Sequence, residues 1–399
     1  MNNKKRILLV NKFYYNRGGD CIVMMNTEKI LRNAGYEVAV YAMDYAQNID
    51  SQFSHYFAPE VTFSGKGLLR AGLRTLGLGD IKASFKKILQ EFDPHIVHFH
   101  NIHSYLSPVI VKMAYEHGCR VLWTLHDYKL ICPSYNCLRN GSPCQLCFND
   151  KSHVVRTRCM KNSLPASILA YVEAVRWNKN VLQKFVHQFI TPSQFMRDKM
   201  IEAGYDAQKI TVISNCIDGS KAQMFENTTR DHTQPPYYCY VGRLSTEKGI
   251  ENLLSVAAQL PYTLYVAGTG PLDEKLRKQY ATNKNIIFTG HLSAQEVVSL
   301  VTNATAMVIP SIWYENNPLS VIESLCMGTP VIGARMGGIP ELIQTPESGL
   351  LFDCHNTDEL KQCIEKMFEQ QPQTPSTIAT PARERYSEAA YLLQLEALF

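Results

Sequence analysis

Short apolar runs of strand length alternate with amphipathic segments of helix length along almost the whole chain. The runs in the first half are RILLVN, EVAVYAM, IVHFHN, RVLWTLHD, QFITPS and ITVIS, and those in the second half are YYCYVG, TLYVAG, IIFTG, AMVIP and PVIGA. Helix-length patterns such as residues 21–33 and 292–303 lie between them. Strands that alternate with helices form parallel sheets covered on both faces, with right-handed crossovers. The alternation therefore predicts an α/β chain of doubly wound, Rossmann-like sheets.

The length of the chain and one polar stretch predict two such domains. A chain of 399 residues is too long for one compact core. The stretch CIDGSKAQMFENTTRDHTQPP interrupts the alternation and ends in two prolines, which is typical of a joint between domains. We expect domains at 1–217 and 218–378, followed by an amphipathic helix at 379–399. Two such domains face a cleft, with ligands at the carboxyl ends of the strands.

The composition indicates the cellular compartment and the charge of the expected partners. No apolar run reaches the roughly 18 residues of a membrane span, and no secretory segment is present. We therefore expect a cytoplasmic protein whose twelve cysteines are thiols or metal ligands. The half up to Ile217 carries about 27 Lys and Arg against about 16 Asp and Glu, roughly +11, and the rest is roughly −7. A basic half favours an anionic partner, membrane or nucleic acid, over an uneven scatter of solvated charges.

One stretch of the basic half is typical of a membrane-surface segment. GKGLLRAGLRTLGLGDIKASFKKILQ, at 65–90, has six Lys and Arg among its leucines. Packing of the leucines on the domain's own sheet explains the pattern equally well. Attachment to the inner face of an anionic membrane is therefore one of two interpretations.

The sequence WYENNPLSVIESLCMGTPVIG places two carboxylates around a helix start. It follows the strand AMVIP, so 311–316 should form the loop at the strand's carboxyl end. Asn317 can cap the helix and Pro318 can occupy its first position, which leaves the amides of Leu319 and Ser320 free to bind a phosphate.

The two glutamates of this stretch have different positions. Glu323 lies inside the helix, within reach of the ribose hydroxyls of the same ligand, whereas Glu315 lies ahead of it, beyond the phosphates. Two unrelated surface acids are the alternative.

A second motif of the same half, YVGRLSTEKGIENLL, places two cations beside a strand end. Arg243 and Lys248 can neutralise a diphosphate there, and solvated loop cations are the alternative. Further on, in VAGTGPL, Gly268 and Gly270 allow a nucleotide to approach the backbone closely.

The first half carries a glycine pair and a histidine cluster. Gly18 and Gly19 stand between the first strand and a helix, either as an ordinary turn or at a ligand. His98 and His100 lie on one face of a strand. With His103 they would suggest a metal site, but core or cleft lining is the better interpretation because no carboxylate is nearby in sequence.

The cysteine-rich stretch CPSYNCLRNGSPCQLCFNDKSHVVRTRC, at 132–159, contains a Cys-x-x-Cys with further cysteines on both sides. This spacing fits a structural, tetrahedral zinc ion, and unmetallated thiols are the alternative. The expected ligands are Cys132, Cys144, Cys147 and Cys159, with Cys137 left over.

Together these motifs resemble glycosyltransferase family 4, which is retaining and has the GT-B fold. The resemblance runs from GG near the start to GLLF at 349–352, and part of the family carries a cysteine-rich insertion like 132–159. It implies that Glu315 contacts the donor sugar, that Glu323 binds the ribose, and that Arg243 and Lys248 bind the diphosphate. The usual glycines and phenylalanine between the glutamates are replaced here by NNPLS, a departure that bears on donor preference.

The resemblance also assigns roles elsewhere. His126, in the HD of WTLHD, should hydrogen-bond the donor sugar, and His100 and Ser193 are expected on the acceptor side. The GG pair should lie beside donor phosphate and acceptor, and the final helix should return to the first domain. The full set of expected donor-binding residues is Gly18, Gly19, Gly242, Gly268, Gly270, Leu292, Asn317, Leu319, Ser320 and Glu323.

The implied activity is transfer of a sugar from a UDP- or GDP-sugar to a hydroxyl of a glycan or lipid-linked acceptor, in capsule, O-antigen or exopolysaccharide synthesis. The chain has no Asp-x-Asp pair, so no catalytic metal is expected. A nucleotide-sugar epimerase or hydrolase of the same fold and a non-catalytic nucleotide-sugar-binding protein are the alternatives. Nucleic acid is disfavoured by the complete donor motifs, and an NAD enzyme by the lack of G-x-G-x-x-G after the first strand.

Overall fold

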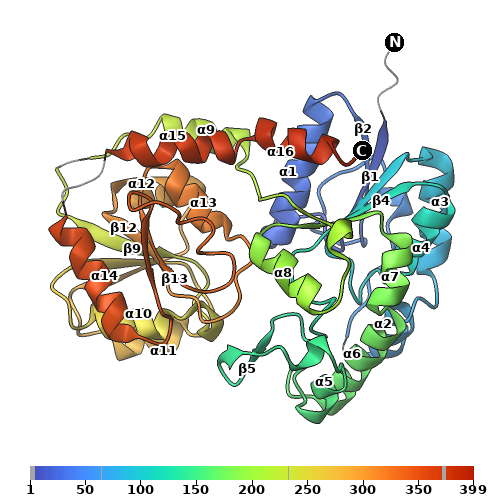
Figure 1. The fold of residues 1–399 in the computed structure, drawn as a ribbon, viewed down its shortest axis with the longest axis horizontal. Coiled ribbons are helices and arrows are strands. Elements are labelled where there is room, and N and C mark those ends of the chain that lie inside the picture. Colours follow the sequence, from blue (N-terminus) through green and yellow to red (C-terminus); the bar gives the residue numbers. More distant parts are fainter. Residues whose placement is uncertain (1–4, 64, 232, 371–373) are drawn as a thin grey trace. The chain divides into compact units, whose positions relative to one another are not determined.

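The computed structural model describes residues 5–63, 65–231, 233–370 and 374–399 (Figure 1). Two compact units share these residues. Unit 1 contains the described residues up to Cys137, together with Cys144–Ser214 and Leu392–Phe399. Unit 2 contains Leu138–Pro143 and Asn215–Tyr391. The main division falls between Ser214 and Asn215, three residues before the boundary expected from the sequence.

Unit 1 is built on a six-stranded parallel sheet with the order β2-β1-β3-β4-β7-β8. Strand β1 is apolar after Arg6, and its Ile7, Leu8 and Leu9 are fully buried, as a parallel strand covered on both faces requires. The strands are β1 (Arg6–Val10), β2 (Glu37–Tyr41), β3 (Ile96–Phe99), β4 (Arg120–Thr124), β7 (Gln188–Thr191) and β8 (Ile210–Val212).

Helices connect these strands, and a short hairpin lies in the cysteine-rich stretch. The α-helices are α1 (Gly19–Asn33), α2 (Leu68–Thr75), α3 (Ile81–Phe92), α4 (Val109–Glu116), α5 (His153–Arg156), α6 (Leu164–Arg176), α7 (Lys179–Phe185) and α8 (Gln194–Glu202). The 3-10 helices are η1 (Ser54–Tyr56), η2 (Gly65–Gly67), η3 (Leu146–Phe148) and η4 (Ala207–Lys209). The hairpin strands are β5 (Leu138–Arg139) and β6 (Ser142–Pro143).

Unit 2 repeats the architecture with the order β11-β10-β9-β12-β13-β14, again all parallel. Along β9, Tyr238 and Tyr240 pack into one apolar core, whereas Tyr237 and Cys239 pack into another. This alternation shows that both faces of the sheet are covered, so the prediction of two doubly wound domains is confirmed. The strands are β9 (Tyr237–Val241), β10 (Thr263–Ala267), β11 (Ile286–Gly290), β12 (Ala306–Ile309), β13 (Val331–Ala334) and β14 (Gly349–Phe352).

The predicted joint between the domains contains a helix of unit 2. Phe225 of α9 is 3% exposed and packs in the same core as Ile217. The polar composition of this stretch hid the helix, because a single buried face requires few apolar residues. The helices of unit 2 are α9 (Gly219–Glu226), η5 (Thr246–Lys248), α10 (Ile250–Ala257), α11 (Asp273–Gln279), α12 (Ala294–Asn303), α13 (Leu319–Cys326), α14 (Thr357–Glu369) and α15 (Pro375–Arg385).

The end of the chain forms two helices where one was expected, α15 and α16 (Glu388–Glu396). The last residues pack on unit 1: the Tyr36 hydroxyl donates to Glu396 at 2.7 Å, and the Arg120 guanidinium donates to the Leu398 carbonyl. None of the described helices is long and apolar enough to cross a membrane.

Candidate functional site

In the sheet of unit 2 the strand order reverses between β9 and β12, which makes this position the topological switch point of the sheet. From this pair the chain adds β10 and β11 on one side and β13 and β14 on the other. The loops that leave the carboxyl ends of two such strands diverge, and ligands bind in the crevice that they leave. The loops here are residues 242–249 and 310–318, which contain the predicted Arg243, Lys248 and Glu315.

A buried ion pair joins these two loops. The Glu315 carboxylate accepts hydrogen bonds from Lys248 Nζ at 2.7 Å, Ser311 Oγ at 2.7 Å and Trp313 Nε1 at 2.9 Å. Glu315 is 7% exposed, and Lys248 Nζ also lies 5.2 Å from the centre of the Trp313 ring. Burial alone would raise the pKa of Glu315, but Lys248 and the three hydrogen bonds outweigh it and lower the pKa. Glu315 is therefore a fixed, ionised carboxylate.

Gly249 brings the two loops into contact. It has φ of 68°, and a Cβ there would lie 1.8 Å from the Pro310 carbonyl oxygen. The Ile312 amide donates to the Glu247 carbonyl at 3.1 Å just beside it. Only glycine fits both the positive φ and the close contact with the Pro310 carbonyl, so Gly249 allows the loop that carries Lys248 to lie beside Glu315.

Arg243 projects from the same loop with its charge uncompensated. The residue is exposed, and within the described chain its guanidinium makes no hydrogen bond or ion pair. Its carbonyl oxygen accepts the Tyr240 hydroxyl at 2.8 Å, which fixes the backbone while the side chain stays available. For binding an anion, the loop therefore provides Arg243, which is unpaired within the described residues, and Lys248, which is already paired with Glu315.

The glycines of VAGTGPL pack closely against the loop after β9, and their predicted role in nucleotide binding stays a prediction. A Cβ on Gly268 would lie 2.0 Å from the Gly242 carbonyl oxygen, and one on Gly270 would lie 2.4 Å from that of Leu244. The loops after β9 and β10 thus touch through their backbones. Gly268 and Gly270 hold the Gly242–Arg243 loop in place, and their lack of side chains is accounted for without a nucleotide.

Helix α13 begins one residue later than expected. Pro318 is the N-cap and Leu319 the first helical residue, with Ser320 following. The Asn317 side chain does not cap this helix, because its Oδ1 accepts the Asn215 amide at 2.9 Å. Leu319 and Ser320 remain half-buried in the first turn, so the helix start keeps its polarity towards an anion.

Glu323 has a cationic partner that sequence reasoning missed. Lys221 Nζ of α9 donates to Glu323 Oε1, across 102 residues of sequence. No motif marks Lys221, because it stands in the stretch interpreted as a joint. The remaining predicted donor residue, Leu292, is half-buried and precedes Ser293, which caps α12 in a capping box with Glu296.

The histidines of unit 1 form a buried network after β3 and β4. His100 Nδ1 and His126 Nε2 are 2.9 Å apart, and His98 Nε2 lies 2.7 Å from Thr124 Oγ1. Burial lowers the pKa of His126 to about 4 and that of His98 to about 3, so both rings are neutral at pH 7. A neutral His126 can donate to or accept from a sugar hydroxyl without adding charge.

The other predicted residues of unit 1 differ in how they are used. Gly18 is the N-cap of α1, where a Cβ would lie 3.5 Å from Asp20 Oδ1, whereas a Cβ on Gly19 would meet no heavy atom within 4 Å. Ser193 is fully buried, and its Oγ accepts the Met196 amide at 3.2 Å as the cap of α8. Its position explains the TPS motif as a helix start, and the acceptor-side role of Ser193 stays a prediction.

The thiols of the cysteine-rich stretch make contacts of their own. Cys137, left over in the prediction, hydrogen-bonds Cys132 and thereby lowers the pKa of Cys132 to about 6, while the Cys159 thiol lies 2.9 Å from Thr157 Oγ1. Among residues 5–63, 65–231, 233–370 and 374–399, no group of three or more His, Cys, Asp or Glu side chains is arranged to hold a metal ion. Cys132, Cys144 and Cys159 nevertheless all act electrostatically on Cys147, so the structural zinc site stays a prediction.

The basic segment 65–90 is less exposed than its sequence suggests. Arg74 is fully buried, donating to Asp80 Oδ1 at 2.6 Å and to the Pro59 carbonyl at 2.7 Å, and Arg70 also pairs with Asp80. These two arginines therefore fix the fold. Leu69 of α2 is 75% exposed.

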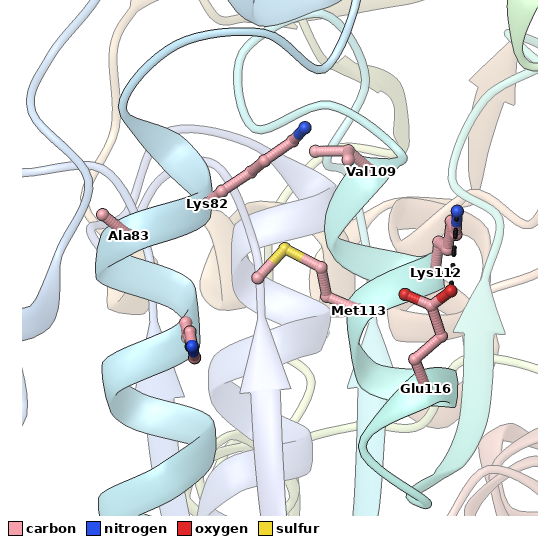
Figure 2. A pocket seen from close by; sticks show the side chains of 7 residues that line it. Lys82, Ala83, Val109, Lys112, Met113 and Glu116 are labelled. Carbon is pink, nitrogen blue, oxygen red and sulfur yellow. Dashed lines mark ion pairs between the residues drawn. The ribbon is translucent and has the colours of Figure 1, made fainter.

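Three lysine side chains line a hollow between α3 and α4. Figure 2 shows Lys82 on α3, and Val109, Lys112 and Met113 on α4, around it, with Lys112 paired to Glu116 at 3.5 Å. Lys86 also lines it. The hollow is therefore lined by apolar side chains together with a net positive charge.

The fold and the donor-side residues define the class of protein. Two Rossmann-like units, with cations and glutamates at the switch point of the second, are the features of GT-B glycosyltransferases. The model "Glycosyltransferase Family 4" matches residues 18–221, and "Glycosyl transferases group 1" matches 223–392. The chain belongs to glycosyltransferase family 4.

Individual relatives agree with this assignment. An uncharacterized 42.6 kDa protein in the cps region of Klebsiella pneumoniae is 27% identical over 71% of this chain and 69% of its own length. A putative colanic acid biosynthesis glycosyltransferase of Salmonella typhimurium is 26% identical over 37% of this chain, which spans 40% of that relative. The crystal structure of Anabaena Alr3699/HepE in complex with UDP matches 98% of each chain with a TM-score of 0.67 at 18% identity, which shows the fold.

Proposed function

We propose that the chain is a retaining glycosyltransferase that moves a sugar from a UDP- or GDP-sugar to a hydroxyl of a glycan or lipid-linked acceptor, in capsule, O-antigen or exopolysaccharide synthesis. The observation that carries the proposal is the Lys248–Glu315 pair at the switch point of unit 2, beside the unpaired Arg243. The relatives named for a cps region and for colanic acid support the pathway class, and the UDP complex supports the donor class.

In this mechanism the bond between the sugar's anomeric carbon and the diphosphate breaks first. Arg243, Lys248 and the first amides of α13 stabilise the charge that develops on the diphosphate. The acceptor oxygen then bonds to the anomeric carbon on the same face, and its proton passes to a phosphate oxygen of the leaving group. No side chain of the protein acts as nucleophile.

The carboxylates and His126 hold the donor. Glu315, fixed by three hydrogen bonds, accepts from hydroxyls of the donor sugar, and Glu323 accepts from the ribose. His126 hydrogen-bonds the donor sugar as a neutral ring. These assignments place charge stabilisation on the cations and positioning on the acids.

Catalysis without a metal is part of the proposal, because the cations take the role that Mg²⁺ plays in other sugar transferases. Activity should survive EDTA present only during the assay. Loss of transfer on brief chelation, with recovery on adding Mg²⁺, would overturn this point. Structural zinc is a separate prediction: metal analysis of protein purified without chelators should give about one zinc per chain, and none if the thiols stay unmetallated.

A thermal-shift panel of UDP-, GDP- and ADP-sugars tests the donor. A ligand at 100 times its Kd stabilises the native state by about 2.7 kcal/mol, which a shift in Tm reports. We expect a shift with UDP- or GDP-sugars that Arg243→Ala removes. Donor turnover without any acceptor would favour an epimerase or hydrolase, and binding without turnover in the presence of acceptor extracts would favour a non-catalytic protein.

We also propose that unit 1 attaches reversibly to anionic membrane. The proposed contact is the hollow between α3 and α4, which is lined by Lys82 and Lys86 of the predicted stretch and by Lys112, Val109 and Met113. Arg70 and Arg74 of the predicted stretch are left out of the contact because both pair with Asp80. Attachment would bring the enzyme to a lipid-linked acceptor.

A further inference from the structure

The sheet of unit 1 has its own switch point, between β1 and β3. The loops that follow β2, β1 and β3 therefore emerge side by side at one edge of the sheet. Two hydrogen bonds join the loops after β1 and β3: the Asn101 backbone amide donates to the side-chain oxygen Oδ1 of Asn11 at 3.0 Å, and the Lys12 amide donates to the Asn101 carbonyl at 3.0 Å. This edge is where a doubly wound sheet binds its ligand.

Aromatic side chains from all three loops gather there. The buried Phe13 ring lies 5.6 Å from Tyr15, 5.3 Å from Tyr45 and 5.8 Å from Tyr105, measured between ring centres. The three tyrosines are half-buried, and within the described residues their hydroxyls make no hydrogen bond. Burial, Glu60 and the neighbouring tyrosines raise the pKa of Tyr45, so its hydroxyl stays a protonated donor. We call Phe13, Tyr15, Tyr45 and Tyr105 the aromatic cluster.

Beside the aromatic cluster lies a polar group that the donor mechanism does not use. Asn101 Nδ2 donates to Asp20 Oδ2 at 3.1 Å and to Asp127 Oδ2 at 3.4 Å, while Asn101 Oδ1 is buried without a hydrogen-bond partner in the described structure. Burial would raise the pKa of Asp20, but Lys12 and His126 lower it overall, whereas burial raises the pKa of Asp127. The charges around Asp20 therefore favour its ionised form.

Lys12 connects the two groups. Its Nζ lies 5.5 Å from the centre of the Phe13 ring and 5.7 Å from that of Tyr105, and it is also the largest favourable charge acting on Asp20. A polar hollow lined by residues 44–54, including Asp44, Tyr45 and Asn48, opens at the same edge. Aromatic faces, free hydroxyls and a carboxylate therefore share one half-exposed region.

This combination matches the chemistry of a sugar ring. A pyranose has an apolar face of C–H groups, which stacks on aromatic rings, and a rim of hydroxyls, which both donate to carboxylates and accept from tyrosines and amides. Lys12 and Arg17, which both lie over the Phe13 ring, balance the charges of Asp20 and Glu60, so the region offers a phosphate no excess positive charge. An alkyl chain would leave the half-buried Asp20 desolvated without compensation. The aromatic cluster and Asp20 thus favour a neutral, polyhydroxylated ligand over a lipid phosphate.

We propose that Asp20, Asn101 and the aromatic cluster bind the terminal sugar of the acceptor, so that the hydroxyl that is glycosylated belongs to a saccharide and not directly to a lipid alcohol or phosphate. The inference rests on the proposed function, since it names the acceptor class for that reaction. The sugar stacks on Tyr15, Tyr45 or Tyr105, and its hydroxyls donate to Asp20. Asp20 is a binding residue here and takes no part in breaking the donor bond.

Saturation-transfer NMR with the full-length chain tests the binding. The probes are the methyl glycosides of glucose, galactose, mannose, rhamnose and N-acetylglucosamine, each with saturating UDP to keep the donor side filled. We expect at least one glycoside to bind, and its signal to fall at least tenfold in Asp20→Asn and in Tyr105→Ala. Tyr115→Ala, which removes an exposed tyrosine of α4, is the matched control and should bind as the wild type does.

Two further readouts separate this inference from the proposed function. Thermal shifts with the donor panel should be the same in Asp20→Asn, Tyr105→Ala and the wild type, and an absent shift in all of them would instead remove the glycosyltransferase proposal. Octanol and farnesyl phosphate, offered as acceptors, should not be glycosylated. Binding of no glycoside, binding that persists in both variants, or transfer to either sugar-free acceptor would overturn the inference.

Discussion

Lys248 and Glu315 stand 67 residues apart in sequence, and their side chains meet at 2.7 Å across the switch point of unit 2. The buried carboxylate depends on this ammonium, so Lys248→Ala removes both a cation for the donor and the partner of Glu315. We expect turnover to fall by about 3 kcal/mol of transition-state stabilisation, roughly a hundredfold, together with a lower Tm. Steady-state rates and thermal melts measure the two effects. Lys275→Ala, which breaks the exposed pair with Glu251, should change neither, and full activity in Lys248→Ala would contradict the mechanism.

Arg243 offers a cleaner separation of activity from stability. Its guanidinium is exposed and unpaired within the described residues, so nothing in the fold depends on it. Arg243→Ala should lower turnover by a similar factor while leaving Tm within about 1 °C, because surface substitutions usually change stability by less than about 0.5 kcal/mol. Unchanged turnover with the correct donor would remove Arg243 from the diphosphate site.

The Lys221–Glu323 contact predicts a shared effect on donor binding. If Lys221 orients Glu323 towards the ribose, Lys221→Met and Glu323→Gln should each raise the KM for the donor, with little change in kcat. The double variant should be no worse than the more damaging single one, because the two residues act as a unit. Additive losses would show that Lys221 acts independently of Glu323, and Lys221→Arg should restore part of the affinity.

Topology explains why some of these residues were predictable and others were not. Arg243, Lys248 and Glu315 stand in contiguous motifs directly after strands, so period and turn signals suffice to place them. Lys221 and the members of the aromatic cluster come from separate loops with no shared motif. Only the strand order β2-β1-β3, which the sequence leaves open, brings Phe13, Tyr45 and Tyr105 together.

Other differences arise because composition does not report packing. The sequence pattern predicts that Arg74 is a surface cation, whereas in the structure it is fully buried and paired with Asp80. The sequence pattern around Gly268 predicts that a nucleotide lies close to its backbone, and in the structure the Gly242 carbonyl lies close to it. In both positions the deciding partner is another part of the protein, set by the tertiary fold, so the residue type alone could not identify it.

The buried histidines predict a loss of stability in acid. His98 has its pKa lowered from 6.5 to about 3, first by burial and then by His126. The unfolded chain therefore takes up a proton below pH 6.5 that the folded state refuses, and the free energy of unfolding falls as pH drops from about 6.5 towards 3. Urea melts between pH 7 and 4 measure the slope. His98→Gln, which removes the titrating ring, should flatten it, and an equal slope in both proteins would refute the assignment to His98.

The hollow between α3 and α4 predicts salt-sensitive binding to anionic membrane. Each Lys near such a surface contributes about 1 kcal/mol, a term that salt screens over roughly 10 Å. Replacing Lys82, Lys86 and Lys112 with Gln should therefore weaken cosedimentation with anionic vesicles by about 3 kcal/mol, on the order of a hundredfold. Replacing Lys275, Lys278 and Lys284 of unit 2 removes the same charge and should have little effect. Donor thermal shifts should be unchanged in both triple variants. Equal partition of the wild type onto neutral and anionic vesicles, or equal losses in the two variants, would leave the hollow as ordinary surface and favour an acceptor free in solution.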